Sequence, residues 1–145
     1  AAQPADVAAF MSRKLMPGES HNVASLQVRY DNDVVASCYA AHVAPWLFNI
    51  TLLGSEANLY IDSPLPFFLP NASGRLELQP AGGTVRQEVA VEWRPTGILQ
   101  LDAFAAAIRQ GAEYAVDGEQ GRRPVAIIDA AIQSAASGTI VPVDL

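Results

Sequence analysis

Residues 100–143 read QLDAFAAAIRQGAEYAVDGEQGRRPVAIIDAAIQSAASGTIVPV. Leu101, Phe104 and Ile108 recur at the spacing of one helical face. Gly111 follows them, and glycine is the residue type that most often ends a helix. The stretch therefore opens with a predicted amphipathic helix that stops before residue 111.

A second helix is predicted between Asp117 and Gly138. Asp117 and Gln120 form the pattern of a capping box at its start. Pro124 conflicts with an unbroken helix, because proline lacks an N–H and its ring clashes one turn back. Either the first turn is separate and Pro124 opens the main helix, or the helix kinks there. The buried stripe is expected to consist of the apolar residues Val125, Ile128, Ile132 and Ala135.

The first two thirds of the chain have the pattern of strands. In residues 21–30, apolar and polar side chains alternate with a period of two, which indicates a half-buried antiparallel strand. Asp-Asn-Asp at residues 31–33 predicts a turn into the next strand. The expected strands cover residues 6–13, 21–30, 34–43, 46–53, 57–62, 76–79, 85–93 and 139–143.

This order of elements predicts an α+β fold: a predominantly antiparallel open sheet of about seven strands with two C-terminal helices on one face. Residues 1–145 are expected to form a single domain, which is long enough to bury a core. Cys38, the only cysteine, lies in an apolar strand pattern, so we expect a buried structural thiol rather than a reactive one. The side chains expected between helices and sheet are Phe104, Ile108, Ile128 and Ile132.

Composition excludes several classes of function. Half of the residues are hydrophobic and 17% are charged, as in globular proteins. The net charge is −6 and the nine Lys and Arg residues are scattered, which argues against a nucleic-acid partner. No apolar run has the length of a membrane span. Two distant histidines and one cysteine do not predict a metal site.

The landmarks of residues 100–143 resemble the C-terminal end of the Gfo/Idh/MocA family of NAD(P)-dependent oxidoreductases. Their order is Phe before Ala-Ile, then Gly, Gly-Glu-x-Gly, Ile-Ile-Asp-Ala-Ala-Ile, Ser-Ala and a Gly turn. Residues 46–62 also resemble a strand, Gly-x-x-Gly, strand unit of the family, with Ala57 in place of the second glycine. The resemblance implies a parent enzyme that acts on sugars, polyols or related compounds with NAD or NADP.

The family's catalytic and cofactor motifs are absent from these 145 residues. No Gly-x-Gly-x-x-Gly occurs, and the Gly-Glu-Gln-Gly at residues 118–121 has the pattern of a helix start. Lys14 is the only lysine and is not in a Glu-Lys-Pro motif. We therefore assign no catalytic and no cofactor-binding residue, and we expect the chain to be a fragment that is inactive without the nucleotide-binding domain of its parent.

Four residues are candidates for a substrate cleft: His42, Trp46, Trp93 and Arg94. In the family, the chain approaches the cleft between the two domains near the positions that these residues occupy. The alternative is that the tryptophans are packed, that His42 is half exposed and that Arg94 is an ordinary surface charge.

The leading hypothesis is a substrate-side and dimerisation domain of a cytoplasmic sugar or polyol oxidoreductase. The resemblance implies a homo-oligomer that forms through the sheet face without helices. The alternative is a free-standing, non-catalytic module that oligomerises or binds a small molecule. A complete small enzyme is a third hypothesis, against which the missing motifs argue.

Overall fold

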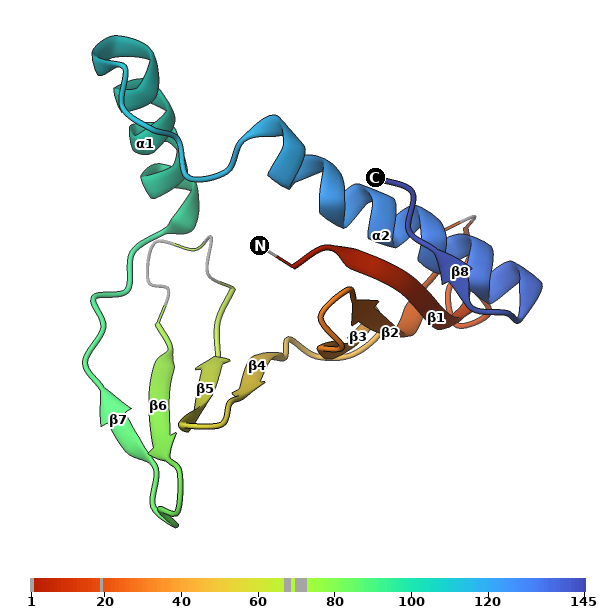
Figure 1. Ribbon diagram of the computed structural model, residues 1–145, viewed down its shortest axis with the longest axis horizontal. Helices are drawn as coiled ribbons and strands as arrows, with labels where there is room; N and C mark the ends of the chain where they lie inside the picture. Colours follow the sequence, from red (N-terminus) through yellow and green to blue (C-terminus); the bar gives the residue numbers. More distant parts are fainter. Residues whose placement is uncertain (1, 19, 67–68, 70–72) are drawn as a thin grey trace. The chain divides into compact units, whose positions relative to one another are not determined.

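The computed structural model describes residues 2–18, 20–66, 69 and 73–145 (Figure 1). The chain divides into two compact units, Ala1–Ala44 with Ala115–Leu145, and Pro45–Tyr114, called here the first and the second unit. Neither helix found in these residues is long and apolar enough to cross a membrane. The elements are β1 (Pro4–Ser12), β2 (Val23–Tyr30), β3 (Val35–Ala41), β4 (Phe48–Leu53), β5 (Ala57–Ser63), β6 (Arg75–Pro80), β7 (Gln87–Val89), α1 (Thr96–Gln110), α2 (Gly118–Ser137) and β8 (Val141–Pro142).

The predicted α+β class and the antiparallel pairing are confirmed. In place of one open sheet of about seven strands, the described residues form two four-stranded sheets. The first has the order β3-β2-β1-β8 and the second the order β4-β5-β6-β7. The division falls between β3 and β4, which follow each other in the chain but are not hydrogen-bonded neighbours.

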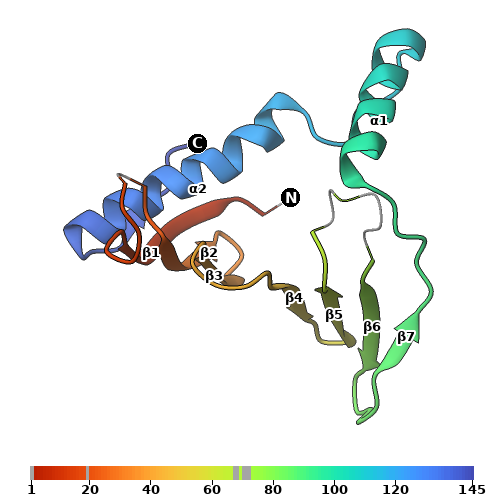
Figure 2. The ribbon, with the colours of Figure 1, turned by 180° about the vertical axis from the view of Figure 1, so that it is seen from behind.

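In the first unit, α2 packs along β1 (Figure 2). Val7 and Ala9 of β1 lie opposite Val28 and Leu26 of β2, so the predicted alternation of β2 places its apolar side under the helix. On the other face, Arg29 lies opposite Asp6, and its guanidinium donates a hydrogen bond to the Asp6 carboxylate. This bond raises the pKa of Arg29.

The core of the first unit is built from small side chains. Its buried apolar residues are Val7, Ala9, Val28, Ala130 and Ala131. Small residues on α2 allow the helix to approach the sheet closely, and the larger Val125, Ile128 and Ile132 of the expected stripe lie outside this face.

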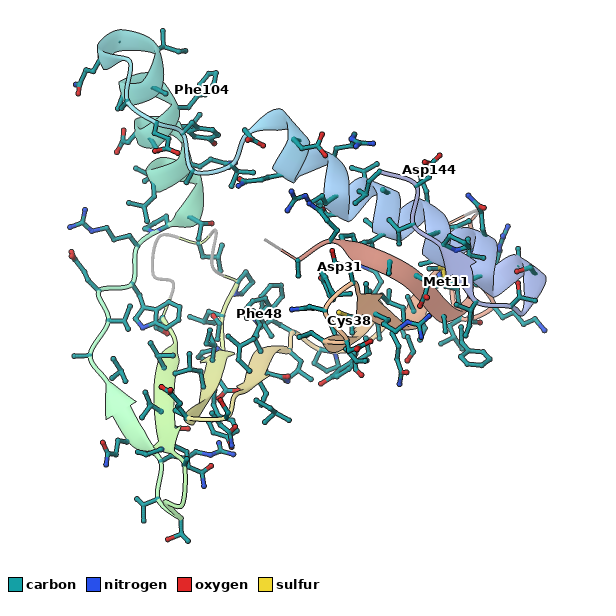
Figure 3. The ribbon with its side chains drawn as sticks, viewed as in Figure 1. Met11, Asp31, Cys38, Phe48, Phe104 and Asp144 are labelled. Carbon is teal, nitrogen blue, oxygen red and sulfur yellow. The ribbon has the colours of Figure 1, made fainter. Side chains whose placement is uncertain are left out.

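The expectation that Phe104, Ile108, Ile128 and Ile132 form the core is therefore wrong. Their side chains are 52%, 69%, 54% and 42% exposed. Phe104, which Figure 3 labels on α1, contacts Tyr114 edge to face, with 5.7 Å between the ring centroids. Hydrophobic spacing identified the helices correctly. Of the expected stripe of α2, Ala135 packs against the core, whereas Val125, Ile128 and Ile132 are exposed.

Ser134 connects α2 to the edge of the first sheet. Its hydroxyl accepts a hydrogen bond from the Ala9 N–H at 3.0 Å and donates one to the Thr139 carbonyl at 2.6 Å. Strand β8 pairs with β1 only at Asp6 and Val7, so β8 does not reach Ala9. The serine hydroxyl thus satisfies a backbone group of β1 that the sheet leaves open.

The predicted ends of α2 are confirmed. Asp117 accepts the Gln120 N–H at 2.7 Å, and the Gln120 side chain accepts the Asp117 N–H at 3.3 Å, which completes the capping box. Gly138 ends the helix with φ 71°, a left-handed conformation that suits glycine. The separate first turn considered for Pro124 is not observed, because α2 continues through this residue. Proline lacks the N–H that would donate a hydrogen bond to the Gln120 carbonyl.

Cys38 is exposed, which corrects the expectation of a buried thiol (Figure 3). It lies opposite Leu26 and thus on the helix side of the sheet. The contacts of α2 are with β1 and β8, whereas β3 is an edge strand. The helix therefore does not cover this position.

The second sheet has one apolar and one polar face. Cross-strand neighbours on the polar face include Tyr60 and Glu77, and Arg86 lies 3.5 Å over the Tyr60 ring. Strand β7 is shorter than the predicted strand at residues 85–93. No hydrophobic side chain described in this unit is fully buried. The apolar face consists of Ile50, Leu52, Leu59, Ile61, Leu76, Leu78 and Val89.

We expect Ser134→Ala to lower the free energy of unfolding by about 1–3 kcal/mol, because it leaves the buried Ala9 N–H and the Thr139 carbonyl without this partner. Chemical denaturation followed by circular dichroism measures the change. Ser137→Ala, an exposed change in the same helix, is the control, with an expected loss below about 1 kcal/mol. Equal losses in the two variants would contradict the role of Ser134.

Candidate functional site

A cavity of about 480 Å³ lies at one end of the second sheet. It lies where β4 begins, β5 ends and β6 begins, so antiparallel pairing brings together three segments that are distant in sequence. The volume lies within the range of small-molecule sites. The lining residues are Trp46, Leu47, Phe48, Asp62, Ser63, Pro64, Ser73, Gly74 and Arg75.

One wall of the cavity is aromatic. The rings of Trp46 and Phe48 are near-parallel at 16°, with 6.5 Å between their centroids. The Trp46 indole N–H donates to the Ser63 carbonyl at 3.0 Å. This hydrogen bond ties the segment before β4 to the end of β5 and orients the indole at the cavity.

The other walls are polar. Asp62 and Arg75 are cross-strand neighbours and both are exposed. Arg75 Nη1 lies 3.3 Å from Glu77 Oε1. The buried Ser63 hydroxyl lies 2.6 Å from the Leu65 carbonyl and 2.9 Å from the Ser73 carbonyl, between which it shares its single proton. Ser63 thus links the two ends of the segment that connects β5 to β6.

Gly74 leaves room for Trp93 beside the cavity. A Cβ at residue 74 would lie 2.5 Å from Cη2 and 2.6 Å from Cζ2 of the Trp93 indole, and 2.7 Å from the Asp62 carbonyl oxygen. No real side chain fits at such distances without displacing its neighbours. The glycine is therefore required by close packing rather than by an unusual backbone angle.

The sequence model of the oxidoreductase family C-terminal alpha/beta domain (Gfo/Idh/MocA) matches residues 2–145. The chain belongs to the Gfo/Idh/MocA oxidoreductase family. The resemblance of residues 100–143 to this family is thus confirmed. No curated protein matches the chain.

Solved structures of Gfo/Idh/MocA-like proteins share this fold. The chain is similar to a putative NADPH-dependent oxidoreductase from Desulfitobacterium hafniense, with 19% identity and a TM-score of 0.85 over 97% of the chain and 42% of that protein. It is also similar to the aldose-aldose oxidoreductase of Caulobacter crescentus, with 22% identity and a TM-score of 0.80 over 97% and 42%. For UDP-N-acetylglucosamine 3-dehydrogenase from Acidithiobacillus ferrooxidans the values are 20% identity and 0.74 over 93% and 41%. The chain therefore spans about two fifths of each of these proteins.

The four residues predicted for a cleft in this Gfo/Idh/MocA domain lie in different places. Trp46 lines the cavity, and Trp93 packs over Gly74 at its border. Arg94 is exposed and pairs with Glu92, with Nη2 2.7 Å from Oε1. His42 belongs to the first unit, where it is exposed and its backbone N–H donates to the Asn22 carbonyl at 2.8 Å.

Sequence reasoning missed Phe48, Asp62 and Arg75. Asp62 and Arg75 could have been found only from the pairing of strands. Asp62 lies near the end of β5 and Arg75 is the first residue of β6, and they become neighbours only when β5 and β6 pair in the correct register. Phe48 is the first residue of β4 and lies two positions after the predicted Trp46.

The lining of the cavity can be read for the kind of molecule that it would hold. A cavity with aromatic rings and polar residues in its lining can hold a small hydroxyl-bearing molecule, because rings pack against C–H groups while polar groups bond to hydroxyls. Neither histidine nor lysine lines the cavity in the described residues. The same part of the chain contains no group of three or more His, Cys, Asp or Glu residues that could hold a metal ion.

We expect Gly74→Ala to displace the Trp93 indole and to destabilise the protein by about 1–3 kcal/mol, because overpacking forces neighbours apart. Tryptophan fluorescence and thermal unfolding report the two effects. Gly97→Ala is the matched control, since nothing lies within 4 Å of its added Cβ. An unchanged emission spectrum for Gly74→Ala would contradict the packing of Trp93 over Gly74.

Proposed function

We propose that this chain is the substrate-side C-terminal domain of an NAD(P)-dependent oxidoreductase that acts on a sugar, a polyol or a related compound. The cavity of the second unit, whose lining includes Trp46, Asp62 and Arg75, is the observation that carries the proposal. The parent enzyme transfers a hydride between nicotinamide and a carbinol carbon. Both units belong to one domain, which the family match over residues 2–145 supports.

Within this domain the residues bind and orient the substrate. The Trp46 ring packs against C–H groups of the substrate. Asp62 accepts hydrogen bonds from its hydroxyls, and Arg75 donates to its oxygens. Relatives support the substrate class, since the Caulobacter crescentus protein is an aldose-aldose oxidoreductase complexed with glycerol and another relative is a UDP-N-acetylglucosamine 3-dehydrogenase.

The described residues do not fit a dinucleotide. Phosphate binding needs a glycine-rich turn from a strand into a helix N-terminus. Gly118 and Gly121 open α2, which follows a loop and the helix α1 rather than a strand. We therefore place NAD or NADP in the nucleotide-binding domain of the parent protein, and the chain is inactive alone. A single free cysteine is compatible with the reducing cytoplasm that we propose as its location.

The face of the first sheet opposite α2 is the proposed surface for a homo-oligomer. Phe10, Ser25 and Tyr39 form one cross-strand row on it, and Phe10 is 83% exposed. The same patch on two copies makes a self-complementary two-fold interface.

The second candidate function is a free-standing, non-catalytic module that oligomerises or binds a small molecule. The observation in its favour is that a single unit supplies every residue that lines the cavity. Activity would separate the two proposals: the first requires that a complete parent protein oxidises the compound that the cavity binds, whereas the second requires binding without turnover.

We expect saturable binding of glucose or glycerol to the 145-residue chain at millimolar concentration, with shifts of the Trp46 indole N–H signal in NMR titrations. Asp62→Asn should weaken this binding about tenfold, because it removes a charge-assisted hydrogen bond. Asp102→Asn makes the same change of charge on α1 and should leave the binding unchanged. NADH should not bind to the chain. Micromolar NADH binding, or sugar-induced shifts only outside the cavity, would contradict the proposal.

In sedimentation we expect a dimer that buries more than roughly 1,200 Å² in total. Phe10→Arg, which places a charge in the centre of the proposed interface, should shift the equilibrium to monomer. Phe104→Arg, on α1, is the control and should leave the dimer intact. A wild-type monomer of 15.4 kDa would contradict the sheet-face interface.

A further inference from the structure

A second cavity, of about 260 Å³, lies in the first unit and has no part in the proposed function. It lies where β1 ends, beside the last turns of α2. It is lined by Met11, Ser12, Arg13, Lys14, His21, Ile132, Ala135 and Ala136.

Basic side chains gather at this cavity in an acidic chain. Arg13, Lys14 and His21 all line it, and Lys14 is the only lysine of a protein with net charge −6. Arg13 Nη2 lies 3.5 Å from His21 Nε2. No carboxylate lines the cavity among the described residues. Glu19, which lies in the same stretch of sequence, is outside the described residues.

The loop that carries Arg13 and Lys14 is held in place by hydrogen bonds to the buried residue Asn22. Asn22 is 8% exposed, and its side-chain oxygen accepts the N–H groups of Leu15 and Met16 at 3.2 and 3.0 Å. The Asn22 N–H donates to the Ser12 carbonyl at 2.7 Å. Asn22 thus fixes both ends of the backbone segment from which Arg13 and Lys14 project, so this segment is ordered before any ligand arrives.

The remaining wall is apolar. Met11 and Ala135 are half-buried against the core of the first unit, and Ile132 stands beside them with a 42% exposed side chain. An inorganic anion that binds to the cations leaves this apolar wall exposed to water. An anion with a compact apolar body covers it and gains the free energy of burying apolar surface.

We propose that this cavity binds a small organic anion, with a phosphate or carboxylate head between Arg13 and Lys14 and an apolar body against Met11 and Ile132. The head accepts hydrogen bonds from the guanidinium and the ammonium, which are stronger than bonds between neutral groups. The competing account is structural: α2 has no basic residue in its last turn, and the two cations would only offset the partial negative charge of that helix end.

Titrations of the 145-residue chain with phenyl phosphate, benzoate, inorganic phosphate and phenol, followed by amide NMR shifts, test the proposal. Phenyl phosphate or benzoate should saturate with shifts at residues 11–14 and 132–136, inorganic phosphate should bind more weakly, and phenol should not bind. The organic anion that binds with the higher affinity identifies the head group as phosphate or carboxylate.

Variants separate the proposal from the structural account. The double variant R13Q/K14Q should weaken binding of the organic anion about tenfold, the equivalent of two partly exposed ion pairs. R109Q/R122Q, with the same loss of charge elsewhere, should retain the affinity. Ile132→Ala should weaken phenyl phosphate and leave inorganic phosphate unchanged.

Circular dichroism verifies that each variant is folded. Three results would overturn the proposal: no saturable binding of either organic anion up to about 20 mM, equal losses in the two double variants, or a loss of stability in R13Q/K14Q without a change of affinity.

Discussion

The first unit depends on the hydrogen bonds of one buried serine. Ser134 accepts from the Ala9 N–H of β1 and donates to the Thr139 carbonyl that leads into β8. Its own carbonyl accepts the Gly138 N–H at 2.8 Å at the end of α2. One residue therefore sets the position of a helix against a strand and the start of the last strand. A buried polar network of this kind is stable only when every member is satisfied, as it is here.

This close approach of α2 decides which surfaces remain open. Ala130 and Ala131 take the helix face next to Ser134, so the larger Val125, Ile128 and Ile132 are left outside the core. In the second unit, no described hydrophobic side chain is fully buried and one face of the sheet is apolar. The first unit thus has a core of its own, whereas the second unit has a cavity that is formed by strand ends. The second unit carries the proposed substrate site of this Gfo/Idh/MocA domain.

Local signals in the sequence predicted much of the fold. The capping box at Asp117 and Gln120, the glycine after α2 and the turn at Asp33, with φ 63°, depend on neighbouring residues alone. The core face of α2 could not be predicted in this way. Hydrophobic spacing favours the larger residues, whereas the closest packing and a hydrogen bond to a distant strand select Ala130, Ala131 and Ser134.

The candidate site was predictable only in part. Trp46 was predicted from its position in the family resemblance, but Asp62 and Arg75 meet through the register of β5 and β6, which no local pattern specifies. The division into two sheets could not be predicted either, because the alternation of apolar and polar residues identifies strands but not the strands with which they pair.

Native-state hydrogen exchange of the wild-type chain, resolved residue by residue, tests this account of the fold most directly. The account predicts that the Ala9 amide is protected to the same degree as the amides of Val7 and Val28, with exchange only through global unfolding, because its hydrogen bond to Ser134 is part of the core. Amides of β6 and β7 should exchange through smaller, local openings. Fast exchange of Ala9 beside a protected Val7, or uniform protection of both units, would contradict it.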